Sequence, residues 1–238
     1  MKKDHRIIIL LLLFVPCTFM VEGQNLDEIL VRYRKASGYP ARLRTRTITS
    51  IGKLTQMGTT LPISIIQKQP DKYRMDVHLP GARITQAYDG SKGWSFNPFL
   101  GKDTLLLEGA ELEQLAESSD FLGILNTYRS SGYKLQLTGI EKWQQTEVFN
   151  LMLSKPSGQT IHFFIDRKTY LILKTEVHLK IDHLEIVAES WFDDYRKVHD
   201  MVLPYHIKNI NGQMLTEIRI DTVRVNEPLD DRLFSTNK

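Results

Sequence analysis

Residues 88–99 read YDGSKGWSFNPF, and this stretch decides the fold class. An apolar segment ends at Tyr88, a glycine-rich turn follows, and an aromatic segment starts at Trp94 and ends at Pro98. Glycines between two such segments favour a β-hairpin, because glycine adopts turn conformations that other residues resist. Trp94 and Phe96 are two residues apart, so they share one face of the second strand. The stretch therefore predicts a hairpin in a large curved sheet and carries no catalytic motif.

The segments around this hairpin follow the same two-residue period. Within 71–79, Tyr73, Met75 and Val77 share one face, and polar residues occupy the other. This alternation indicates a strand with one buried and one solvated face, as antiparallel sheets allow. Asn211-Gly212 is the strongest hairpin signal, because this pair tolerates the positive φ angles of a type I′ turn. Further strands are expected at 42–56, 60–68 and 82–88, and from 134 almost to the end of the chain.

Two helical regions interrupt the strand pattern. The first starts at Asn25, a residue type that caps helices, and ends at Gly38 and Pro40. The second is an insert at 109–130 that contains two short amphipathic helices. Helices this short are unstable alone, so they must cover an apolar surface. We therefore expect the insert to form a lid over the sheet through four leucines, Leu112, Leu115, Leu122 and Leu125.

The first 23 residues predict a secretory signal peptide. Basic residues precede an apolar run at 7–15, which is shorter than the roughly 18 residues of a membrane-spanning helix. Cleavage is expected after Gly23, so that 24–238 forms a single exported domain that starts at Gln24. Acylation at Cys17, the sole cysteine, is the less favoured interpretation, because Pro16 stands where lipoprotein signals have a small residue. The expected location is the periplasm.

The charge pattern gives one further feature. The formal net charge is only +3, which together with export argues against a nucleic-acid partner. Arg42, Arg44 and Arg46 alternate with other residues, so they would share one face of the strand expected at 42–56. A solvated strand face is the favoured interpretation of this row. Contact with lipid phosphate or with an acidic partner is the alternative.

Three stretches carry a family resemblance. They are Pro70–Met75, the pattern Asp-Gly-x-x-x-Trp-x-x-Asn-Pro-Phe at 89–99, and the tail from Ile220 to Phe234. Together with the order of helix, strands, helical insert and strands, they resemble the LolA/LolB family of periplasmic outer-membrane lipoprotein carriers. The likeness is best over 68–103 and extends over 25–236.

The resemblance implies a mainly β fold with an N-terminal helix. Its core is a curved antiparallel sheet of about eleven strands, an incomplete barrel closed by a helical lid, whose concave face binds acyl chains. Tyr73, Met75 and Val77 match the cavity-lining strand of the family, and we expect Trp94 and Phe96 to join them at the cavity or its rim. The family's carrier has an Arg directly before the strand-opening Pro, where this chain has Gln69.

Catalytic and metal-binding motifs are absent from the sequence. It has no Gly-x-Ser-x-Gly elbow and no His-Glu-x-x-His zinc helix. His162 and Asp166 lie four apart in a strand-like stretch, which separates them by about 13 Å, too far for a proton relay. We expect a monomeric, non-enzymatic carrier without cofactor, whose partners are lipid or lipoprotein acyl chains and an envelope membrane protein. The alternative is a lipid-sensing regulatory or protein-interaction module.

Overall fold

The computed structural model describes residues 25–101, 103–181 and 184–236. The expected signal peptide and Cys17 lie outside these residues. Helices are α1 (Leu26–Ser37), α2 (Tyr39–Arg44), α3 (Gly109–Ser118), α4 (Ile124–Thr127) and the 3₁₀ turn η1 (Asp231–Leu233). Strands of the first half are β1 (Thr47–Gln56), β2 (Thr59–Lys68), β3 (Lys72–Leu79), β4 (Ala82–Tyr88), β5 (Gly93–Phe96) and β6 (Leu105–Leu107). Strands of the second half are β7 (Lys134–Trp143), β8 (Thr146–Ser154), β9 (Thr160–Asp166), β10 (Ile172–Ile181), β11 (Leu184–Val198), β12 (Met201–Asn211) and β13 (Met214–Val225).

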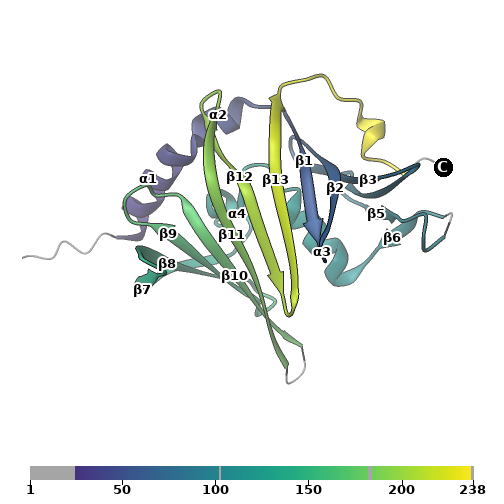
Figure 1. The fold of residues 1–238 in the computed structure, drawn as a ribbon. Helices are drawn as coiled ribbons and strands as arrows, with labels where there is room; N and C mark the ends of the chain where they lie inside the picture. The colour runs from purple at the N-terminus through teal and green to yellow at the C-terminus, as the bar shows by residue number, and fades with distance from the viewer. Residues whose placement is uncertain (1–24, 102, 182–183, 237–238) are drawn as a thin grey trace, which may run out of the picture.

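All thirteen described strands form one sheet, in the order β6-β5-β4-β3-β2-β1-β13-β12-β11-β10-β9-β8-β7. Each neighbouring pair is antiparallel, and β6 and β7 form the two edges, so the sheet curves without closing (Figure 1). The expected mainly β, curved antiparallel fold is confirmed. The strand number exceeds the expected eleven or so, and the short edge strand β6 is one that the sequence did not predict.

The two hairpins that the sequence predicts are present. Tyr88 pairs with Gly93 across the turn of 89–92, where Gly90 has φ 101° and Asp89 accepts hydrogen bonds from the backbone N–H groups of Ser91 and Lys92. Asn211 pairs with Met214 across the second turn. Local turn chemistry therefore sets both registers.

The N-terminal helix also starts where expected. Asn25 caps α1, because its Oδ1 accepts the backbone N–H of Glu28 at 2.8 Å. Gly38 ends the helix in the left-handed conformation, with φ 73°. An added Cβ there would lie 2.0 Å from the carbonyl oxygen of Asp200, so the corner between α1 and α2 is pressed against the turn from β11 to β12. No described helix is long and apolar enough to cross a membrane.

The strand expected at 42–56 starts later than predicted. Pro40 lies in the first turn of α2, where proline fits because its missing N–H is not needed, and the chain stays helical to Arg44. Only from Thr47 does it join β2 and β13. The alternation of Arg42, Arg44 and Arg46 therefore does not place them on one strand face.

The core consists of connected clusters that differ between the two halves of the sheet. In the half formed by β7–β10, α1 and α4 pack against the sheet through fully buried side chains such as Ile29 and Leu125. Leu151, Phe163 and Ile165 face them from the strands. The largest cluster of buried side chains thus lies in this half, whereas β3, β4 and β5 of the other half are covered by α3.

Candidate functional site

The helix α3 lies across the concave face at β5. Gly93 makes this close approach easy, since a Cβ there would lie 2.8 Å from Leu112 Cδ1 and 3.2 Å from Leu115 Cδ2. The C-terminal end of α3 is held from both halves of the sheet. Gln67 of β2 donates to the carbonyl of Ser118, and Lys155, next to β8, pairs with Glu117. The helix therefore bridges the open sheet as a fixed cover.

Beneath α3 the concave face keeps a cavity of about 410 Å³. Its apolar lining comes from strands and helix together, as Leu54, Tyr73, Met75, Leu107, Leu115 and Ile218. Polar side chains share the wall, as Gln86, Glu111, Gln114, Ser118, Asn209 and Thr216. Pockets that hold small ligands measure about 300–1,000 Å³ and combine apolar walls with a few polar groups, so this cavity falls within the range of a binding site.

The predicted cavity strand lies where the alternation placed it. Tyr73 and Met75 line the cavity, and Val77 continues the same face and packs with Ile63 in an adjoining apolar cluster. Burial raises the pKa of Tyr73 to about 12, so its hydroxyl stays neutral in an otherwise uncharged strand face. A role for these residues in ligand binding stays a prediction.

Trp94 and Phe96 lie on the opposite face from their predicted place. Tyr88 pairs with Gly93, so Trp94 pairs with Ala87 and shares the face of Arg74 rather than that of Tyr73. Its indole N–H donates to the carbonyl of Phe234 at 2.7 Å. The C-terminal segment thus covers Trp94 from outside, and the cavity face of β5 carries only Gly93 and Ser95.

The four predicted lid leucines divide into two groups. Leu112 and Leu115 belong to α3 and both approach Gly93, and Leu115 also lines the cavity. Leu125 is 1% exposed inside the cluster of α1 and β8–β10, and Leu122 packs with Ile48 and Met201. The insert therefore places one helix over the cavity and the other within the packed core.

The cavity wall from β12 and β13 was missed by the sequence interpretation. Asn209 and Thr216 face each other across these strands, and Ile218 follows on the same face. The Asn211-Gly212 turn is the signal that could have found them, because it fixes the register that pairs the two strands.

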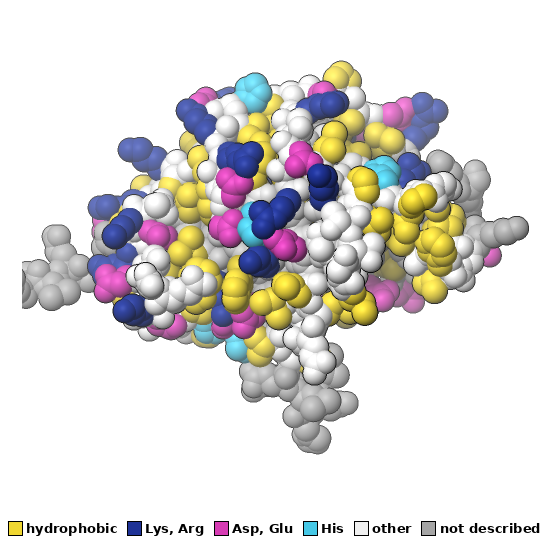
Figure 2. Space-filling model, in the orientation of Figure 1, with side chains coloured by type: hydrophobic (Ala, Val, Ile, Leu, Met, Phe, Trp, Pro, Cys, Tyr) yellow, Lys and Arg dark blue, Asp and Glu magenta, His cyan; other side chains and the backbone are white. Residues whose placement is uncertain are grey.

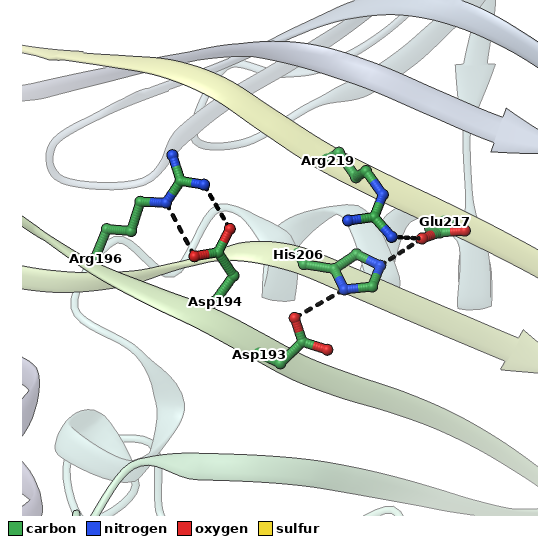
Figure 3. A network of polar contacts seen from close by, with 6 residues as sticks. All are labelled: Asp193, Asp194, Arg196, His206, Glu217 and Arg219. Atoms are coloured by element: carbon green, nitrogen blue, oxygen red, sulfur yellow. Dashed lines mark hydrogen bonds and ion pairs between the residues drawn. The ribbon is translucent and has the colours of Figure 1, made fainter.

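The densest cluster of charged side chains lies on the outer face of the sheet (Figure 3). His206, with a side chain only 7% exposed, meets Asp193 through Nδ1 at 2.8 Å and Glu217 through Nε2 at 2.6 Å. Burial raises the pKa of Glu217, but hydrogen bonds from His206 and Arg219 outweigh it and lower that pKa. In Figure 2, side chains of both signs gather over the middle of this face.

The charged side chains of this cluster are paired with one another. Asp194 accepts two hydrogen bonds from Arg196, and these bonds lower its pKa. The network thus contains three carboxylates, two arginines and one histidine, and both ring nitrogens of the histidine face carboxylate oxygens. Such a network ties β11, β12 and β13 together and holds no unpaired nucleophile or base.

His162 and Asp166 each have other hydrogen-bonding partners. Nδ1 of His162 hydrogen-bonds Asn150 at 2.9 Å, whereas Asp166 accepts backbone N–H groups of the turn that follows it. The two side chains therefore serve separate contacts. Within the described ranges, no group of three or more His, Cys, Asp or Glu side chains has a metal-binding arrangement.

The fold has counterparts of known structure. A LolA superfamily protein from Nitrosomonas europaea superposes with a TM-score of 0.60 at 11% identity, covering 90% of this chain and 99% of its own. A DUF1329 family protein from Desulfovibrio piger gives 0.61 at 16%, covering 87% and 97%. A Vibrio parahaemolyticus domain named for outer-membrane lipoprotein sorting gives 0.58 at 14%, covering 85% and 97%.

Sequence comparison adds nothing to these structural likenesses, because neither a family model nor a curated protein matches the chain. At such identities the likeness concerns the fold. The shared feature is the mainly β fold, which in this chain is built on one open antiparallel sheet. The chain is thus a LolA-like protein in fold, as its hairpin motif predicts.

Proposed function

We propose that this protein is a non-enzymatic carrier that binds acyl chains of lipid or lipoprotein in the cavity under α3. The observation that carries the proposal is the unfilled space of about 410 Å³ between α3 and the sheet, whose other half holds a large cluster of buried side chains. Protein interiors are usually filled with side chains, because the residues around a void lose dispersion contacts and the fold loses stability. A retained space whose walls are partly apolar and partly polar is therefore suited to an amphiphilic guest molecule.

The lining indicates the chemistry of that guest. Leu54, Met75 and Ile218 form an apolar floor, and each methylene that leaves water against such a floor gains about 0.8 kcal/mol. Met75 adds a flexible and polarisable side chain that adapts to different shapes. The neutral amides of Gln86 and Gln114 on the wall are suited to hydrogen-bond the head of an amphiphile.

Gln69, the residue before Pro70, stands where the family's carrier has the Arg that passes cargo onward. The side chain of Gln69 donates to the carbonyl of Arg42 at 3.3 Å, and the neighbouring Lys68 pairs with Asp231 at 2.7 Å. Both side chains thus tie the end of β2 to neighbouring segments. The proposal therefore covers the carrying of a guest in the cell envelope and does not include handover through this position.

A cavity-filling substitution tests the proposal. Met75→Trp places an indole in the cavity, whereas His78→Trp places the same ring on the exposed outer face of β3. We expect the protein purified from the envelope to release lipid on organic extraction and to take up a fluorescent fatty acid. Met75→Trp should lose most of this uptake, and His78→Trp should keep it.

Two results would reject the carrier function. One is a purified protein that holds no lipid and ignores the fatty acid. The other is equal uptake by the Met75→Trp and His78→Trp variants, with both folded by circular dichroism. A stoichiometric envelope partner, recovered from cells with a protein that binds no lipid, would favour an interaction module instead.

A further inference from the structure

A second concave feature lies on the outer side of α1 and α2, remote from the lining of the cavity. The core-facing stripe of α1 includes Ile29 and Leu30. The residues Val31, Arg34, Lys35 and Gly38 recur at the same helical spacing along another side of the helix. Together with residues of α2 they line a groove of about 530 Å³. The groove is thus built by a second stripe of the same helix.

The corner that forms this groove is rigid. Gly38 leaves no room for a Cβ against the β11–β12 turn, and Thr45 at the end of α2 donates its hydroxyl to the carbonyl of Ala41 at 3.0 Å. Arg42 points inward and donates to the carbonyl of Phe121. The relative placement of α1 and α2 is therefore set by the close approach of Gly38 to the backbone and by side-chain hydrogen bonds to backbone carbonyls, all within the protein itself.

The groove combines exposed apolar side chains with positive charge. Val31, which lines the groove, is 62% exposed. Leu43 is not part of the lining, but it precedes the lining residue Arg44 on α2 and is 50% exposed, although both Val and Leu are residue types that normally avoid water. Of the nine lining residues, Arg34, Lys35 and Arg44 are basic, and Asp200 alone is acidic. Asp200 also lies 3.2 Å from Lys197, which offsets its charge.

We propose that the α1–α2 corner docks the protein onto an anionic lipid bilayer. Interfacial membrane binding needs apolar side chains that enter the headgroup region and cations that face the phosphates beside them. Val31 and Leu43 supply the first, and Lys35 and Arg44 supply the second. The surface is open rather than deep, as contact with a bilayer requires. The row of alternating arginines thus contributes Arg44 to a membrane surface, while Arg42 holds the fold.

Charge and hydrophobicity make separate, measurable contributions. Each Lys or Arg near an anionic leaflet strengthens binding roughly fivefold, so Lys35→Gln with Arg44→Gln should weaken it about 30-fold. Sodium chloride at 1 M shortens the screening length to about 3 Å and should abolish most of the charge-dependent part. Val31→Ser with Leu43→Ser leaves the charges and should reduce binding at every salt concentration.

The test is co-sedimentation of the processed protein, purified from the cell envelope, with vesicles of phosphatidylcholine containing or lacking 30% phosphatidylglycerol. The matched control is Lys53→Gln with Lys142→Gln, two exposed lysines on β1 and β7 that remove the same charge elsewhere. We expect the wild type and this control to bind the anionic vesicles alike. The groove variants should bind more weakly in the amounts given above.

Two outcomes would overturn the docking surface. They are equal binding to anionic and neutral vesicles, and equal weakening by the groove and control variants. The proposal does not rest on the cavity. If the protein binds vesicles but takes up no fatty acid, the docking surface is supported and the carrier function is rejected. If it takes up fatty acid but does not bind vesicles, the carrier function is supported and the docking surface is rejected.

Discussion

The division of the helical insert into a core helix and a cover helix predicts unequal losses for two similar substitutions. Leu125 is 1% exposed and lies among the buried side chains of α1, β8 and β9, whereas Leu112 is half-buried against Gly93. Leu→Ala at fully buried sites costs about 2.7–5.0 kcal/mol, since the cavity left behind adds to the lost transfer free energy. We expect about 3 kcal/mol for Leu125→Ala and less than about 1 kcal/mol for Leu112→Ala.

Urea titration followed by far-UV circular dichroism measures both losses. A chain of this size should unfold with a slope near 3 kcal/mol per molar urea, so Leu125→Ala should lower the midpoint by about 1 M. Leu112→Ala should lower it by less than about 0.3 M. Fatty-acid uptake should respond in the opposite order, because Leu112 belongs to α3, the helix that covers the cavity, whereas Leu125 lies in the packed cluster of α1, β8 and β9. Equal shifts of the two midpoints, or a loss below about 1 kcal/mol for Leu125→Ala, would refute the assignment of α4 to the core.

Three further predictions concern stability. Trp94→Phe should cost about 1 kcal/mol in urea unfolding, through loss of the hydrogen bond to Phe234, and leave fatty-acid uptake unchanged, since the ring lies on the outer face. Gly38→Ala should cost about 2 kcal/mol or more in thermal unfolding, because φ is 73° and a Cβ would lie 2.0 Å from a backbone carbonyl oxygen. Burial raises the pKa of Glu176, but hydrogen bonds from Lys174 and His178 outweigh it and lower that pKa below 4.5. The stability that this carboxylate contributes is therefore complete above pH 4.5 and is lost as the pH falls through the pKa of the folded state. The free energy of unfolding, measured from pH 7 to pH 3, should therefore fall less steeply with decreasing pH in Glu176→Gln than in the wild type.

The strand interpretation succeeded where a residue's face depends on local alternation. Tyr73, Met75 and Val77 lie on one face because successive side chains of a strand point to opposite sides. Trp94 and Phe96 follow the same rule and share a face, but it is the outer face of the sheet and not the cavity face on which they were expected. Their face depends on which residue pairs with Tyr88 after the turn, and a shift by one residue reverses every side chain that follows.

The helical insert shows a similar limit. Leu112 and Leu125 have the same apolar character and belong to helices of similar pattern, so both were expected in a lid. Their environments differ because α4 packs against the buried side chains of β8 and β9, whereas α3 lies over Gly93 and the cavity. Amphipathic spacing shows that a helix has a buried face and says nothing of what that face contacts.

Sequence alone determined the mainly β architecture, the capped first helix, the two hairpins and the helical insert. All of these depend on contacts between residues close along the chain, which propensity and periodicity record directly. Tertiary structure decided that Trp94 lies under the C-terminal segment, that Arg42 points inward and Arg44 outward, and that a space of about 410 Å³ remains under α3. These features depend on the register between distant strands and on whether facing side chains fill the volume between them, which only the assembled sheet and helices fix.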